Sequence, residues 1–135
     1  MRKSVLLFFL LSLLSLLMIH CNRRAESQLH ERLSQMAKEL NESTPVMLDS
    51  YTRFDEATVT KENLFRYRYT VLNTHNPDSL LSDRLQTLTD NIRIMFSTND
   101  ELAIFRENNV VLEYIYNDEQ QQTIRTITIK PEDYQ

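Results

Sequence analysis

The sequence predicts an α+β domain, with two helices packed on a four-stranded antiparallel sheet, behind an apolar leader. Residues 5–19 form one long apolar run, two later segments carry apolar residues at helical spacing, and the segments between them alternate as strands do. The element order is helix, hairpin, helix, hairpin. A length of 135 residues suits one domain. We therefore expect a signal peptide or membrane anchor over residues 1–20 and a single exported domain over residues 21–135.

The first twenty residues have the layout of an export signal. Arg2 and Lys3 precede the apolar run from Val5 to Ile19. As a helix this run would measure roughly 22 Å, which is shorter than the ~30 Å apolar layer of a membrane. A leader that is removed or replaced by lipid fits this length better than a stable spanning helix. An uncleaved N-terminal anchor and a fully released protein are the alternatives.

Cys21 follows the apolar run directly. The segment Leu17-Met18-Ile19-His20-Cys21 resembles the lipobox of bacterial lipoproteins, in which a peptidase cleaves before a cysteine whose sulfur has been acylated. The resemblance implies that Cys21 carries acyl chains such as palmitate and tethers the domain to a membrane, facing the periplasm or the exterior. Lipoproteins normally have a small residue where this chain has His20, so the uncleaved anchor stays open. Asn22 replaces the Asp that commonly retains lipoproteins at the inner membrane, which favours the outer membrane.

The exported part is acidic. Arg2 and Lys3 are lost with the leader, which leaves 13 basic and 19 acidic residues and a net charge of −6. A body of this charge has no general attraction to nucleic acid or to anionic lipid. We expect no nucleic-acid partner, and we expect contact with the membrane through the lipid anchor or the N-terminal segment.

The helices are indicated by apolar spacing and by the residues at their ends. Between Arg24 and Asn41, apolar residues recur every three or four positions, and Pro45 prevents continuation of the helix. Asn76 and Pro77 predict the start of the second helix, which continues to about Phe96, because Asn caps free N–H groups and proline fits the first turn. A short helical turn is expected at residues 100–108. The two apolar faces are formed by Leu29, Leu33, Met36 and Leu40, and by Leu81, Leu85, Leu88, Ile92 and Met95.

The strands are predicted to form two hairpins. Residues 46–60 and 64–72 make the first, with a bulge or break in its first arm near Asp55. Alternation in its second arm places Phe65, Tyr67, Tyr69 and Val71 on one face and Leu64, Arg66, Arg68, Thr70 and Leu72 on the other. Residues 110–116 and 123–130 make the second hairpin, and Pro131 ends it.

The last third of the chain carries a second resemblance. Residues 110–118 read VVLEYIYND and residues 124–129 read IRTITI, before an acidic end. This pattern resembles small, mostly uncharacterised bacterial exported proteins with a helix-plus-antiparallel-sheet domain. The resemblance implies a fold without an activity.

The run Arg66-Tyr67-Arg68-Tyr69 is the most unusual surface feature of the predicted domain. Two guanidinium groups on one sheet face suit the carboxylates of a partner protein or lipid phosphates. Arg66, Arg68, Tyr67 and Tyr69 are therefore candidate partner-binding residues. The alternative is that the tyrosines join the core while the arginines pair with acidic residues on a neighbouring strand.

The sequence lacks the residue patterns that mark phosphate loops, disulfides and metal clusters. A chain without glycine has no Gly-rich phosphate loop, and a single cysteine cannot form an internal disulfide or a thiolate metal cluster. His20, His30 and His75 lack the spacing of metal ligands. We expect no catalytic residue, cofactor or metal.

The function predicted from these observations is that of a non-enzymatic, membrane-tethered protein of the cell envelope that binds an envelope protein. Candidate roles are an accessory factor of an envelope or secretion assembly, an inhibitor and an immunity factor. The alternatives are a binder of a small apolar or lipid ligand between helices and sheet, and a small hydrolase.

Overall fold

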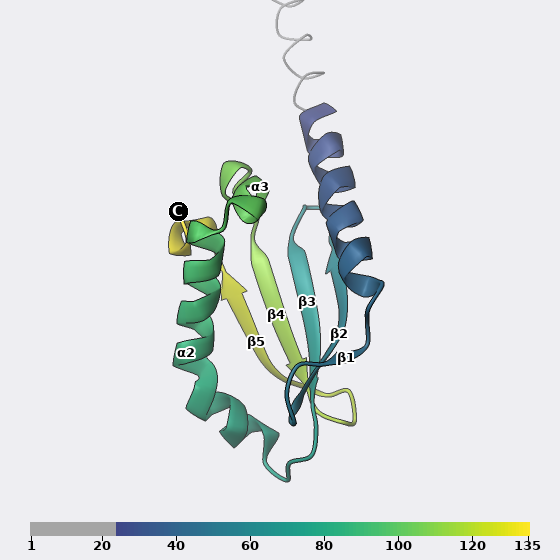
Figure 1. The fold of residues 1–135 in the computed structure, drawn as a ribbon, viewed down its shortest axis with the longest axis vertical. Helices are drawn as coiled ribbons and strands as arrows, with labels where there is room; N and C mark the ends of the chain where they lie inside the picture. Colours follow the sequence, from purple (N-terminus) through teal and green to yellow (C-terminus); the bar gives the residue numbers. More distant parts are fainter. Residues whose placement is uncertain (1–23) are drawn as a thin grey trace, which may run out of the picture.

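The computed structural model describes residues 24–135, so the leader and Cys21 lie outside the described part. The described chain contains three α-helices and one five-stranded sheet (Figure 1). The first helix spans residues 24–41, and the others are α2 (Pro77–Thr98) and α3 (Ala103–Glu107). There are also two 3₁₀ turns. η1 (Asp100–Leu102) comes directly before α3, and η2 (Pro131–Asp133) lies just before the C-terminus. The strands are β1 (Val46–Met47), β2 (Thr52–Val59), β3 (Phe65–Val71), β4 (Leu112–Asn117) and β5 (Thr123–Ile129).

The strands lie in the order β1-β2-β3-β4-β5, and the α+β class is confirmed. Two details of the predicted sheet are wrong. The sheet has a fifth strand, β1, and it is mixed, because β3 and β4 run parallel while the other neighbours run antiparallel.

The parallel pairing follows from the connection between β3 and β4. The 22 residues of α2 span about 33 Å, enough to carry the chain back along the whole length of β3. After η1 and α3, β4 therefore starts beside the start of β3, with Phe65 opposite Leu112. A helix between two strands is the usual connection for a parallel pair.

Both predicted hairpins are present. β2 pairs with β3, and the register shifts between Phe54 and Glu56, which places the expected bulge at Asp55. The arm predicted over residues 46–60 is split, however, because the chain turns back at residues 48–51 and pairs β1 with β2. β4 and β5 form the second hairpin.

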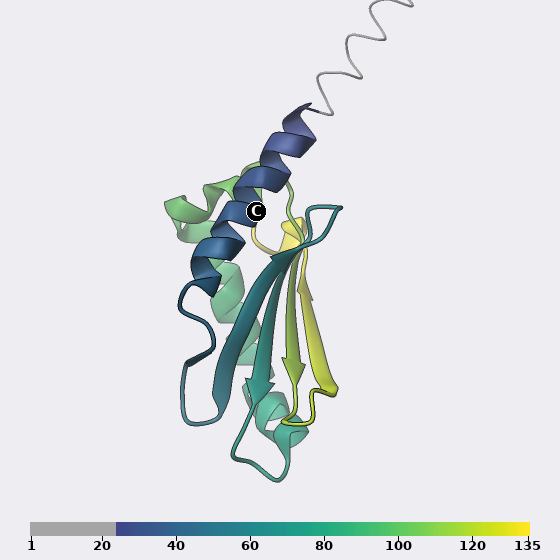
Figure 2. The same ribbon diagram turned by 90° about the vertical axis from the view of Figure 1, so that its right-hand side faces the viewer.

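The three α-helices lie on one face of the sheet and leave the other face uncovered (Figure 2). The first helix buries Leu33 and α2 buries Ile92 and Phe96 against the inner face of the sheet. Phe105 of α3 packs edge-on against Phe65 and Phe96, with ring centroids 5.3 and 5.0 Å away. The predicted cap of α2 is also present, since Asn76 Oδ1 accepts from the Ser79 N–H at 3.2 Å.

Turns that usually contain glycine are made by other residues in this glycine-free chain. Asn63, Asn73, Asn109 and Gln121 have positive φ angles between 53° and 63°. Asn tolerates this left-handed conformation better than most residues with a side chain. The chain therefore forms tight connections between its elements without glycine.

Candidate partner-binding groove

Four stacked tyrosines form the middle of the sheet's inner face. The parallel register places Tyr67 opposite Tyr114 and Tyr69 opposite Tyr116. The rings of the first pair stack with centroids 4.7 Å apart and those of the second pair 4.9 Å apart. Burial raises the pKa of all four phenols above the ordinary tyrosine value, so they keep their protons to a higher pH than exposed tyrosines do.

The two candidate arginines lie on the opposite, uncovered face of the sheet. Arg66 Nε donates to Glu113 Oε2 of β4 at 2.5 Å, and Arg68 Nη1 donates to Glu56 Oε1 of β2 at 2.6 Å. The structure thus divides Arg66, Arg68, Tyr67 and Tyr69 between two faces. It matches the alternative in which the tyrosines pack inward and the arginines pair across strands.

The first helix and α2 are held to the sheet at separate places. Asn41, the last residue of the first helix, exchanges two hydrogen bonds with the backbone of Ala57 in β2. On the far side, Arg125 of β5 donates to Asp78 of α2 at 2.6 Å. Figure 1 shows the two helices apart, with β3 and β4 visible between them.

An apolar groove of about 530 Å³ occupies part of this gap. Its floor is Phe65 and Tyr67 of β3, and its polar rim is formed by Glu39, Ser43 and Asn99. Apolar side chains of the helices and of η1 form its walls: Met36, Leu40, Met95, Phe96 and Leu102. Leu40 and Met95 are 40% and 43% exposed, which is unusual for residues of an amphipathic helix's apolar face. The groove can therefore bury apolar side chains of another molecule.

Tyr67, one of the candidate partner-binding residues, lines the groove, whereas the sequence does not distinguish the groove residues of the helices from core residues. Met36, Leu40 and Met95 were all placed on the apolar faces of the two helices, as Leu33 and Ile92 were. Helical spacing shows which side of a helix faces the sheet, but it does not show where two helices fail to meet.

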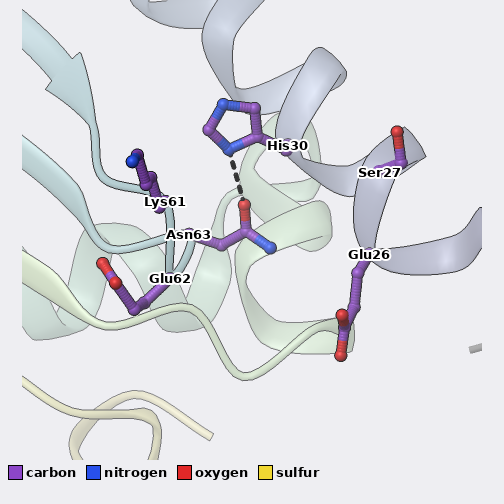
Figure 3. Close-up of a pocket in the computed structure, with 6 residues that line it drawn as sticks. All are labelled: Glu26, Ser27, His30, Lys61, Glu62 and Asn63. Atoms are coloured by element: carbon purple, nitrogen blue, oxygen red, sulfur yellow. Dashed lines mark hydrogen bonds between the residues drawn. The ribbon is translucent and has the colours of Figure 1, made fainter. Parts of the chain in front are cut away.

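A second, polar hollow of about 500 Å³ lies between the first helix and the β2–β3 turn (Figure 3). His30 Nδ1 lies 2.9 Å from Asn63 Oδ1 there. The side chains of Glu26, Lys61 and Glu62 point in different directions around this pair (Figure 3). The hydrogen bond joins the helix to the turn, and the surrounding charges do not converge on a common point.

Metal binding and membrane crossing are two further possibilities for residues 24–135. No group of three or more His, Cys, Asp or Glu side chains within that range is arranged to hold a metal ion. No helix within it has both the length and the apolar character needed to cross a membrane.

Residues 28–126 match the family described as "Domain of unknown function (DUF8479)". The chain belongs to the DUF8479 family. No curated protein matches this DUF8479 member in sequence.

Several solved structures share the fold. A Pseudomonas aeruginosa protein described as secreted superposes with a TM-score of 0.69 at 15% identity, over 82% of this chain and 96% of that one. The type 2 secretion system pilotin EpsS of Vibrio vulnificus gives 0.57 at 12% identity, over 82% and 94%. The type II secretion system pilotin AspS of Vibrio cholerae gives 0.60 at 12% identity, over 82% and 96%. At these identities the likeness establishes a shared fold.

Proposed function

We propose that this DUF8479 chain is a membrane-tethered accessory protein of the bacterial cell envelope. Its groove between the first helix and α2 would hold a segment of a partner protein, and the partner would belong to a secretion assembly. The observation that carries the proposal is the groove itself, in which exposed Leu40 and Met95 face each other across an aromatic floor.

The lining of the groove favours a helical occupant. Its walls are helices and its floor is made of side chains, so it offers no free strand edge to an extended peptide. A segment buried there must satisfy its own backbone hydrogen bonds, as a helix does. Apolar side chains on one face of that helix would then contact Met36, Met95 and Tyr67.

The envelope location and the class of partner have separate support. The leader and Cys21 resemble those of a lipoprotein. Two proteins with the same fold are pilotins of secretion systems, and a third is described as secreted.

Photo-crosslinking in living cells tests the proposal. A photoreactive amino acid is placed at Met95, which lines the groove, or at Ile94, which is 60% exposed but does not line it. Both positions lie on α2 and both are accessible, so they form a matched pair. We expect a discrete adduct with an envelope protein from position 95 and not from position 94. Equal adducts from both positions, or none from position 95, would contradict the proposal.

A small apolar or lipid ligand remains the second candidate, because the volume of the groove lies within the range of small-molecule sites. Native mass spectrometry of the purified chain separates the two candidates. A retained small molecule that is lost in the Met95→Asp variant would favour the ligand.

A further inference from the structure

A third hollow, distinct from the one beside His30, adjoins the groove at the end of the molecule where the first helix begins. It measures about 660 Å³ and lies between the first helix on one side and η1 with α3 on the other. Met36 lines both spaces, and Leu102 in the groove directly follows Glu101 in the hollow. The hollow therefore adjoins the groove, and we call it the acidic mouth.

The acidic mouth carries more negative than positive charge. Four carboxylates line it, from Glu31, Asp100, Glu101 and Glu107, against one lining guanidinium from Arg32. Arg106, which does not line the hollow, approaches Asp100 at 3.9 Å and offsets part of this negative charge. Within residues 24–135, Glu31, Glu101 and Glu107 take part in no ion pair.

Carboxylates outside ion pairs also occur elsewhere in the described chain, for example at Glu42 and Asp83, so the acidic mouth is distinguished by its place beside the groove. Elsewhere in the described chain, most arginines face a carboxylate: Arg53, Arg66, Arg68, Arg84, Arg93 and Arg125 are each within 4 Å of one. At the mouth, by contrast, the charges surround an apolar base made by Met36, Ala103 and Ile104. All four carboxylates belong to exposed residues, and a basic side chain placed among them would be attracted by each one.

We propose that the partner segment in the groove carries a cluster of Lys or Arg at one end, and that this end lies in the acidic mouth. This inference rests on the proposed function and adds the charge and orientation of the segment. The apolar part of the segment fills the space between Met36 and Met95. Its basic end then points toward η1 and α3, at the end of the domain where the first helix begins (Figure 1).

Charge reversal tests the inference with the crosslinker fixed at Met95. The double variant Glu31→Lys with Glu107→Lys should lower the yield of the adduct by about tenfold, since two attractive contacts become repulsive. The matched control is Asp83→Lys with Glu42→Lys, which changes the net charge equally at exposed positions outside the mouth. The control should keep the parental yield. The adduct yield of the neutral variant Glu31→Gln with Glu107→Gln should lie between the yields of the charge-reversed variant and the control.

The attachment site supplies an independent readout. Mass spectrometry of the Met95 adduct identifies the bound segment of the partner, and we expect at least two Lys or Arg residues within two helical turns of the attachment point. If the segment lacks basic residues, or if the charge-reversed variant keeps the parental yield, the inference is wrong while the groove proposal stands. If Met95 gives no more adduct than Ile94, the proposed function fails as well.

Discussion

At the scale of single residues, Asn41 connects the first helix to the edge of the sheet. Its Nδ2 donates to the Ala57 carbonyl at 2.8 Å, and its Oδ1 accepts from the Ala57 N–H at 2.7 Å. β1 pairs with only Phe54 and Arg53 of β2. The Asn41 amide thus replaces a neighbouring strand at Ala57, where the backbone groups would otherwise lack a partner.

Replacing Asn41 with Ala should destabilise the domain by about 1–3 kcal/mol, because both polar groups of Ala57 lose their partner. Chemical denaturation measures the effect. Asn91→Ala is the control, since Asn91 is exposed on α2 and the same type of side chain is removed. Asn41→Asp keeps an acceptor but loses the donor, and we expect an intermediate loss. Equal stability of the Asn41→Ala and Asn91→Ala variants would show that the contact contributes nothing.

Residue-scale predictions from the sequence succeeded where they rested on alternation. In β3, alternation correctly separated Tyr67 and Tyr69 from Arg66 and Arg68, because successive strand residues point to opposite faces. The pairing of the arginines with acidic residues on neighbouring strands was one of the two alternatives that this alternation left open. The pairing partners Glu56 and Glu113 could not be chosen, because they depend on which strands are neighbours and in which register.

At the scale of elements, the tyrosine stack follows from the parallel pairing of β3 and β4. Tyr67 and Tyr69 are two residues apart, as are Tyr114 and Tyr116, so both pairs face the helices. A single parallel register then brings all four rings together. Burial raises the pKa of each ring, and burial also raises the pKa of Tyr134, near the C-terminus, to about 12.

These shifts predict a loss of stability in alkaline solution. In the unfolded chain the tyrosines release protons near pH 10, whereas in the folded chain they retain them to higher pH. The contribution of the buried tyrosines to the free energy of unfolding is fully present below pH 10. It decreases as the pH rises toward and beyond 12. Denaturant titrations between pH 8 and 12 measure it. Tyr114→Phe, which removes one buried phenol, should reduce the slope of the decline above pH 10, and an unchanged slope would contradict this account.

The elements themselves were largely predictable, and their spatial order was not. Apolar spacing and capping residues identified the first helix, α2 and both hairpins, and the unevenness of residues 46–60 indicated the bulge at Asp55. The parallel contact of β3 with β4 was missed because hydrophobic patterns give the faces of a strand but not its neighbours. The two residues of β1 are too few to show any periodicity.

At the scale of the whole molecule, the groove exists because the two long helices are attached to different strands. The first helix is fixed to β2 through Asn41, and α2 is fixed to β5 through Arg125. Tyr67 of β3 is left partly uncovered between them, and Phe65 lies buried beside it. No local pattern in the sequence records such a gap, which is why the candidate site came from the structure.

We propose that residues 1–23 determine the location of the domain, and intact mass of the membrane-extracted protein tests this. If Cys21 is acylated and the leader removed, the mass should equal that of residues 21–135 plus acyl chains. Cys21→Ala should then abolish the acyl mass and keep the leader, because cleavage requires the modified cysteine.

A second variant combines Cys21→Ala with the leader of a soluble exported protein in place of residues 1–20. We expect it in the soluble fraction, because it lacks the acyl chains whose burial holds the protein on the membrane. The full-length mass in the parent would instead indicate an uncleaved anchor, and membrane residence of the second variant would contradict lipid tethering.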